Sequence, residues 1–198
     1  MTATVNSNMT LSPVTIFDPA KHGYLTPAFA FIHEDCIVTD NTLATFHPPF
    51  QHANPEAPDV RVLEYWKNNV AKVTEGTKII FMQMVVSERG QEELAGYVAL
   101  GSQATETGPF RGSVEKLLVS PRYRKMGVAK RLMTKLEEVA LMRGTTLLTL
   151  DTEAGSPAEG VYPRLGYTRL GMIPRYGLSP KDGRLVDEVF FYKDLRST

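Results

Sequence analysis

Residues 114–140, VEKLLVSPRYRKMGVAKRLMTKLEEVA, constrain the fold of this chain more than any other segment. Val114–Val119 has the composition of a strand, and a turn containing Pro121 follows it. From Met126 to Arg143 the apolar side chains recur at helical spacing, and Gly144 is a typical helix end. They are Val128, Ala129, Leu132, Leu136, Val139 and Ala140. A strand, a tight turn and an amphipathic helix in this order indicate an α/β architecture.

The turn itself predicts an anion site. Arg124-x-x-Gly127-x-Ala129 opens the helix, where backbone N–H groups have no partner within the helix. Gly127 permits close approach of a ligand, and basic side chains surround it. A pyrophosphate suits this spacing best.

The other segments alternate between strand and helix patterns. We expect strands at 14–17, 78–87, 93–102, 146–152, 167–173 and 187–193, and helices at 25–36, 59–74 and 157–165. The run TLLTLDT at 146–152 is almost continuously apolar, as in a strand buried on both faces. Four prolines make 45–58 an irregular loop. The polar residues 1–13 predict a flexible arm, and 14–198 a single domain with a mixed sheet.

Composition excludes several classes of function. Lys+Arg and Asp+Glu both number 22, so net charge indicates neither nucleic acid nor a membrane surface as partner. The single cysteine, Cys36, rules out an internal disulfide and a thiolate-rich zinc site. The first twenty residues have no targeting pattern and no segment is apolar enough to span a membrane. These features predict a cytoplasmic protein.

The segment Val119–Ala129, followed by Gly155-Ser156-Pro157-Ala158-x-x-x-Tyr162-x-x-x-Gly166-Tyr167, resembles the GCN5-related N-acetyltransferase (GNAT) superfamily. Within it, four stretches are similar to tabtoxin-resistance acetyltransferases: 115–117, LDTEAGSPAE at 150–159, 173–176 and 190–193. The resemblance implies a mostly antiparallel sheet that splays at the acetyl-CoA site, with helices on both faces. Many GNAT enzymes have Asn at the position of Gly155, which leaves that pantetheine contact in doubt.

The resemblance also implies acetyl-CoA as co-substrate and no metal. Its pantetheine arm would lie along the backbone of Leu117, Leu118 and Val119, since a splayed strand leaves backbone groups that an amide-bearing arm can pair. The pyrophosphate would bind the loop and first helical turn, which comprise Arg124, Lys125, Met126, Gly127, Val128, Ala129 and Lys130. The charged members of this set, and Arg122, could instead form a solvated helix face.

Three residues are catalytic candidates. Glu115 lies in an apolar strand and Asp151 ends another, and a lone carboxylate there is costly unless it is paired or faces a wet cleft. The resembling enzymes are thought to use two acids at these places, one of them as base. In GNAT enzymes, the tyrosine at the position of Tyr162 commonly protonates the leaving thiolate. As alternatives, Glu115 could pair with Lys or Arg, Asp151 could cap the turn at 153–156, and Tyr162 could be a packing residue.

For the acceptor pocket we expect Phe46, His47 and Phe50 of the Pro-rich loop as one wall, with Tyr176 as a further lining residue. Two other groups of residues are weaker candidates for a functional site. His33 and Cys36 share a helix face without the surroundings of a family nucleophile motif, and His47 with His52 lacks a properly spaced third zinc ligand.

The primary hypothesis is an N-acetyltransferase that transfers acetyl to a primary amine of a small molecule, as in detoxification of a toxin or antibiotic. One alternative is an acyl-CoA-binding sensor without catalysis. A further one is acetylation of a protein Lys or N-terminus. The partner would be a small amine, and the protein a monomer or homodimer.

Overall fold

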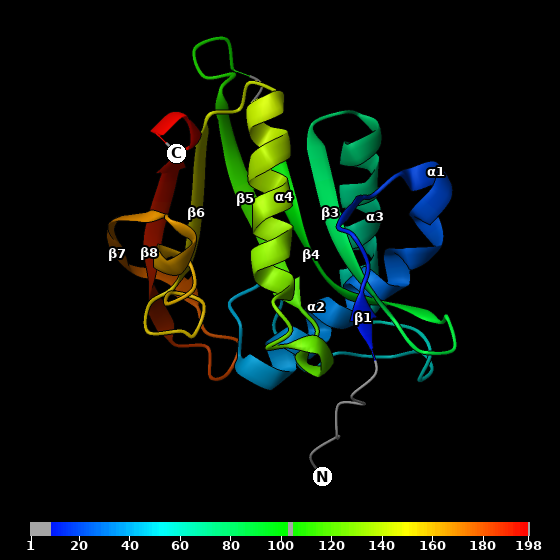
Figure 1. Ribbon diagram of the computed structural model, residues 1–198. Coiled ribbons are helices and arrows are strands. Elements are labelled where there is room, and N and C mark those ends of the chain that lie inside the picture. The colour runs from blue at the N-terminus through cyan, green and yellow to red at the C-terminus, as the bar shows by residue number, and fades with distance from the viewer. Residues whose placement is uncertain (1–8, 103–104, 198) are drawn as a thin grey trace.

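A mixed sheet forms the centre of the fold in the computed structural model, which describes residues 9–102 and 105–197 (Figure 1). The strands lie in the order β1-β3-β4-β5-β6-β8-β7, with β2 also paired to β3. Their bounds are β1 Thr10–Leu11, β2 Thr15–Ile16, β3 Lys78–Val86, β4 Glu92–Ser102, β5 Arg111–Val119, β6 Leu147–Glu153, β7 Thr168–Leu178 and β8 Leu185–Asp194. All pairs are antiparallel except β5 with β6. The predicted mixed sheet is confirmed.

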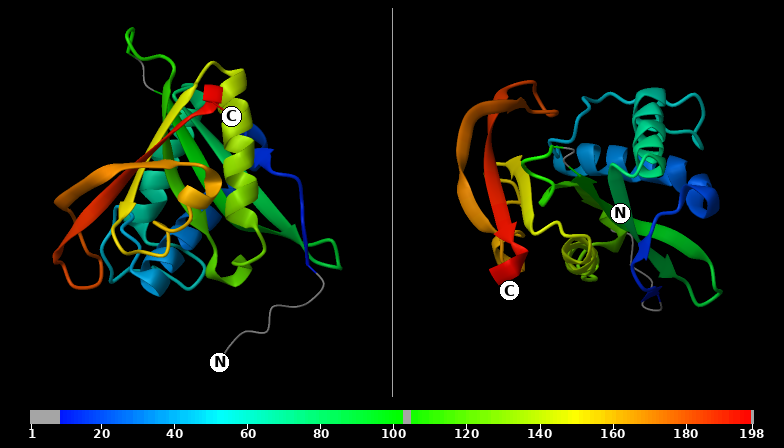
Figure 2. Two further views of the ribbon diagram at one scale, coloured as in Figure 1. Left: turned by 60° about the vertical axis from the view of Figure 1, so that its left-hand side comes forward. Right: turned by 90° about the horizontal axis from the view of Figure 1, so that it is seen from above.

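Helices cover both faces of the sheet (Figure 2). Helix α4 (Val128–Met142) lies on one face, and α2 (Thr26–Asp40) and α3 (Val60–Thr74) lie on the other. The shorter elements are α1 Pro19–His22 and the 3₁₀ turns η1 Gly23–Leu25, η2 Pro121–Tyr123, η3 Pro163–Leu165 and η4 Leu195–Ser197. Among the described residues no helix is both long and apolar enough to cross a membrane.

Each face has its own apolar core. Under α4, the buried side chains Leu132, Leu136 and Val139 pack on residues from β3 through β8, so this core continues across the whole sheet. Under α2 and α3, Phe29, Trp66 and Tyr97 form an aromatic cluster with ring centroids 4.8–5.2 Å apart. The helical face predicted for α4 is therefore the buried one, with Met133 in addition.

Three expectations about local structure need correction. Thr10–Leu11 pair with β3, so this part of the predicted arm belongs to the sheet, while residues 1–8 lie outside the described residues. Strand β6 alternates between buried and exposed positions, because only its α4 side is covered. The helix expected at 157–165 is a series of turns that ends in the 3₁₀ turn Pro163–Leu165.

Strands β5 and β6 are paired over only part of their length, and the opening between them positions the site. Their parallel pairing is confined to Arg111–Ser113 with Leu147–Thr149. Beyond it the two strands separate toward the end of the sheet where α4 begins (Figure 1). On its other edge β5 stays paired to β4, with two residues, Lys116 and Leu117, opposite Val98 alone. Lys116 has φ 53°, so this bulge redirects β5 where the opening starts.

Candidate active site

A cavity of about 810 Å³ occupies the opening between β5 and β6. Its walls come from the end of β5, the loop before α4 with the first turn of that helix, and the segment 152–165. Nine of the ten predicted cofactor-binding residues line it: Leu117, Leu118, Val119, Arg124, Lys125, Gly127, Val128, Ala129 and Lys130. Met126 instead packs against the α4 core. The structure thus brings these cofactor-binding candidates together around one space, which Tyr162 also lines, whereas Glu115 and Asp151 are not among its lining residues.

The start of α4 has the geometry of an anion site. The first helical hydrogen bond runs from the Arg131 N–H to the Gly127 carbonyl at 3.1 Å, so the N–H groups of Val128, Ala129 and Lys130 have no acceptor within the helix. Gly127 has φ 83°, a left-handed conformation that favours glycine. Free N–H groups and the helix dipole together favour a phosphate at this wall of the cavity.

The basic side chains near this loop are partly engaged elsewhere. Arg124 forms an ion pair with Asp40 at the end of α2, with 2.5 Å between nitrogen and oxygen. Arg122 pairs with Glu93 at 3.0 Å and stacks beside Tyr123. Each of these arginines therefore already has a partner within the protein. The main part of the predicted phosphate site is the backbone of the loop, whose N–H groups have no acceptor within the helix.

Tyr162 lines the same cavity from the segment after β6. Its ring is 7% exposed and packs 5.5 Å from that of Phe191. Burial, with the nearby charge of Asp151, raises the pKa of Tyr162 to about 12. The phenol therefore keeps its proton at neutral pH, which suits a donor to a leaving thiolate.

A second, smaller cavity of about 340 Å³ adjoins the first, and Leu43 lines both. Loop residues 43–47 form one wall, and the β7–β8 hairpin forms the other with Tyr176, Leu185 and Glu188. Three of the four predicted acceptor residues, Phe46, His47 and Tyr176, lie here. Phe50 does not: it packs at the edge of the aromatic core, with the Arg61 guanidinium 6.0 Å from its ring centroid.

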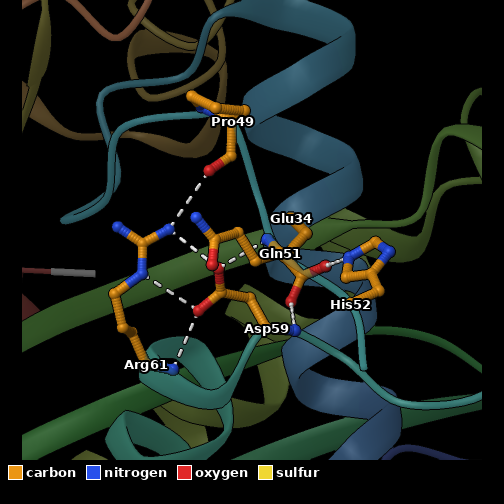
Figure 3. Close-up of polar contacts among 6 residues, drawn as sticks. All are labelled: Glu34, Pro49, Gln51, His52, Asp59 and Arg61. Carbon is orange, nitrogen blue, oxygen red and sulfur yellow. Dashed lines mark hydrogen bonds and ion pairs between the residues drawn. The ribbon is translucent and has the colours of Figure 1, made fainter. Parts of the chain in front are cut away.

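The loop that carries this wall is held by a buried polar network (Figure 3). The carboxylate of Glu34, on α2, accepts the Asp59 N–H at 2.8 Å and lies 2.7 Å from His52 Nε2. Asp59 caps α3 by accepting the Arg61 N–H at 2.8 Å, and it also accepts the Gln51 N–H at 2.9 Å. These bonds tie the middle and the C-terminal end of the Pro-rich segment to α2 and α3.

Of the two acidic candidates, Glu115 is paired. Its carboxylate accepts bonds from Lys78 Nζ at 2.5 Å and from Ser113 Oγ at 2.8 Å. Burial alone would raise the pKa of Glu115, but Lys78 and Ser113 outweigh it and lower the pKa overall. A lowered pKa makes a weak base. The pairing considered from the sequence is thus present, and a catalytic role of Glu115 stays a prediction.

Asp151 has a partner that sequence reasoning missed. Glu188 on β8, which is 6% exposed, lies close enough to Asp151 for the two carboxyl groups to interact. Burial and the neighbouring carboxylates of Asp151 and Glu153 raise the pKa of Glu188 to about 7. Lys116, on the bulge of β5, lies near both carboxylates and opposes that rise. The signal for Glu188 in the sequence was a carboxylate near the start of the apolar strand VDEVFF.

The remaining candidates are structural. His33 is fully buried, accepts a bond from Trp66 Nε1 at 3.2 Å and lies 2.7 Å from the Ala44 carbonyl, and burial lowers its pKa to about 4. Burial also raises the pKa of Cys36 to about 11, so its thiol stays protonated. Within the described ranges no group of three or more His, Cys, Asp or Glu could hold a metal ion.

Residues 40–167 match the Acetyltransferase (GNAT) family. The chain belongs to this family. The N-terminal acetyltransferase B complex catalytic subunit NAA20 of Arabidopsis thaliana is 28% identical over 100 residues, which covers 50% of this chain and 57% of that protein. Another curated relative is matched over only 24% of its length, so this chain spans a quarter to somewhat more than half of these relatives.

Solved GNAT structures have the same fold. The yncA protein of Salmonella typhimurium, solved with its cofactor acetyl-CoA, superposes with a TM-score of 0.64 at 18% identity, covering 96% of this chain and 95% of that one. The ribosomal-protein-alanine N-acetyltransferase of Brucella melitensis gives 0.63 at 24% identity, covering 92% and 99%. At these identities the likeness concerns the fold.

Proposed function

We propose that this protein transfers acetyl from acetyl-CoA to a primary amine of a small molecule, by direct attack in a ternary complex. The observation that carries the proposal is the pair of adjoining cavities where β5 parts from β6. The larger is lined by a phosphate-type helix start and by Tyr162. The smaller is lined by the carboxylate of Glu188, which suits an ammonium group.

The larger cavity fits acetyl-CoA in form and chemistry. The pyrophosphate would accept hydrogen bonds from the N–H groups of Val128, Ala129 and Lys130. The pantetheine would pair with the β5 backbone beyond Ser113, which has no β6 partner there. The thioester would then lie toward Leu117 and Tyr162, where the arm reaches the second cavity.

This chain's own groups account for what the reaction needs. Cavity walls hold thioester and amine together, and orientation supplies much of the rate. Tyr162 is placed to protonate the thiolate, and an acid at Glu115 or Asp151 would assist loss of the ammonium proton. A sensor that only bound acyl-CoA would need neither an acid in the second cavity nor a phenol at the thioester.

A protein α-amine is the second candidate acceptor. It is favoured by the names of two similar proteins, which act on protein N-termini or ribosomal-protein alanine. The small volume of the second cavity, about 340 Å³, between 43–47 and the β7–β8 hairpin favours a small amine instead. We place the protein in the cytoplasm, where acetyl-CoA is available.

The test is release of CoA by purified protein against a panel of small amines, amino acids, polyamines and short peptides with free N-termini. We expect turnover with one class of small amine. Tight acetyl-CoA binding without turnover on any member would favour the sensor, and turnover on peptides alone would favour the protein acceptor.

Glu115→Gln separates the two roles of that residue. As a base, its loss would lower kcat with little change in stability. As the partner of buried Lys78, its loss would lower the unfolding midpoint with kcat retained.

A further inference from the structure

We infer that Glu188, which lines the smaller cavity beside Asp151, is the group that takes the proton from the acceptor ammonium. The inference deepens the proposed function and rests on it. It moves the role of base from β5 to a carboxyl pair that joins β6 and β8.

The register of the sheet brings the pair together. Glu153 lies opposite Glu188, and Asp151 lies opposite Phe190 in the same antiparallel pair. The neighbouring residues Leu150 and Val189 are buried in the core under α4, so Asp151 and Glu188 point to the other face. The smaller cavity, which shares Leu43 with the larger one, is lined by Glu188.

Glu188 lines the acceptor cavity, and the fold leaves space for its carboxylate. A Cβ at Gly177 of the adjacent strand β7 would lie 2.7 Å from Glu188 Oε1 and 2.6 Å from Leu43 Cδ2. Glycine at 177 therefore lets the carboxylate lie between the hairpin and the loop. Asp151 is exposed and lies close enough to Tyr162 to raise its pKa. Glu188 thus lines the acceptor cavity, while its neighbour Asp151 lies near the tyrosine of the donor cavity.

The charged groups around Glu188 affect its pKa. Asp151 and Glu153 on β6 raise the pKa, Lys116 on β5 lowers it, and His47 lines the cavity from the loop. A negative charge beside a carboxylate favours its protonated form, because like charges in close contact cannot both ionise easily. Glu188 therefore accepts a proton near neutral pH, whereas the pKa of Glu115 is lowered by Lys78.

The step balances as follows. The ammonium gives one proton to the Glu188 carboxylate, and the neutral amine attacks the thioester carbon. A C–N bond forms, the C–S bond breaks with its electron pair on sulfur, and the amide nitrogen loses its second proton as the thiolate gains one from Tyr162. The nitrogen's proton returns to the Tyr162 oxygen, and Glu188 releases its proton to solvent. The products are the acetamide, CoA thiol and one proton.

The test is the pH dependence of kcat/KM with the acceptor found in the amine panel. In the native protein we expect an acid limb with an apparent pKa of about 7. Glu188→Gln is expected to lower kcat about 10²–10⁴-fold and remove that limb. Asp151→Asn is expected to move the limb to lower pH, and Lys116→Met to higher pH, because they remove charges of opposite sign beside Glu188.

Opposite shifts of the limb distinguish proton transfer from support of the fold. Glu138→Gln, which changes an exposed residue paired with Lys135 on α4, is the matched control and should leave the profile unchanged. Acetyl-CoA affinity and unfolding midpoint are measured for every variant. If Glu188→Gln is folded, binds acetyl-CoA and keeps the native limb and kcat, the inference is wrong. If Glu188→Gln fails to fold, the shifts in Asp151→Asn and Lys116→Met decide, and no shift in either overturns it.

A direct titration keeps this inference separate from the proposed function. Carbon-13 NMR of side-chain-labelled glutamate should show one carboxyl titrating near pH 7 that is missing in Glu188→Gln. No turnover on any acceptor contradicts the proposed function even if this signal is present. Turnover by a protein without such a signal overturns the role of Glu188 alone.

Discussion

At the scale of single residues, Tyr162 lines the donor cavity and lies close enough to Asp151 for that carboxylate to raise its pKa. Tyr162→Phe removes this proton donor and keeps the ring packing on Phe191. We expect kcat to fall about 10²-fold or more, with acetyl-CoA affinity nearly unchanged, in steady-state and equilibrium binding measurements. Tyr167→Phe is the matched control, because that ring contacts Tyr162 but does not line the cavity. Equal kcat in the native protein and Tyr162→Phe would contradict the role as acid.

Asp59 makes a residue-scale prediction about stability and pH. The Arg61 guanidinium holds the pKa of Asp59 well below its usual range, so its charged form stabilises the fold fully above about pH 4 and less as pH falls through the lowered value. Asp59→Asn keeps the N-cap geometry but loses the charge, whereas Asp59→Ala loses both. We expect Asp59→Ala to be less stable than Asp59→Asn by about 1 kcal/mol in urea unfolding at pH 7.

The pH dependence of the unfolding free energy tests whether the charge of Asp59 stabilises the fold. The native protein should lose its advantage over Asp59→Asn as the pH falls from 5 toward 2, because protonation removes the ion pair with Arg61. A constant difference in unfolding free energy across this range would mean that the charge of Asp59 does not stabilise the fold.

At the scale of elements, the start of α4 combines a left-handed backbone position with the anion site. Gly127→Ala places a Cβ at φ 83° and is expected to cost about 1 kcal/mol of stability. It should also weaken acetyl-CoA binding several-fold, because a shifted first turn misdirects the N–H groups. Calorimetric titration measures this effect.

The other end of the same helix offers a matched control. Gly144 has φ 79° and lies away from the cavity, so Gly144→Ala should cost similar stability without changing affinity. Equal affinity loss in both variants would mean that helix stability, and not the geometry of the first turn, sets binding.

The elements also show what sequence reasoning can reach. Local patterns predicted α3, the strands β3 and β4 and the α4 face, because periodicity signals lie within the element itself. The helix expected at 157–165 was wrong, because the backbone bonds of this segment span three residues, as from the Val161 N–H to the Ala158 carbonyl, and form turns. Glu188 was missed because its significance depends on the β6–β8 register, which no local pattern reveals.

At the scale of the whole molecule, the sheet is joined across β5 and β6 by three residue pairs and by the core under α4. The donor cavity lies between these two parts, with residues of both in its walls. A ligand that contacts both parts binds the native state and not the unfolded chain. Its binding therefore raises the stability of the fold as a unit.

Acetyl-CoA at about 100 times its dissociation constant should stabilise the protein by about 2.7 kcal/mol, and the thermal midpoint should rise with ligand concentration. S-acetylpantetheine, which lacks the pyrophosphate, should give a much smaller shift at the same concentration because it cannot use the N–H groups at the start of α4. Differential scanning fluorimetry with both ligands compares them directly. Equal shifts would mean that the pantetheine arm alone bridges the two parts of the sheet and that the helix start contributes no phosphate binding.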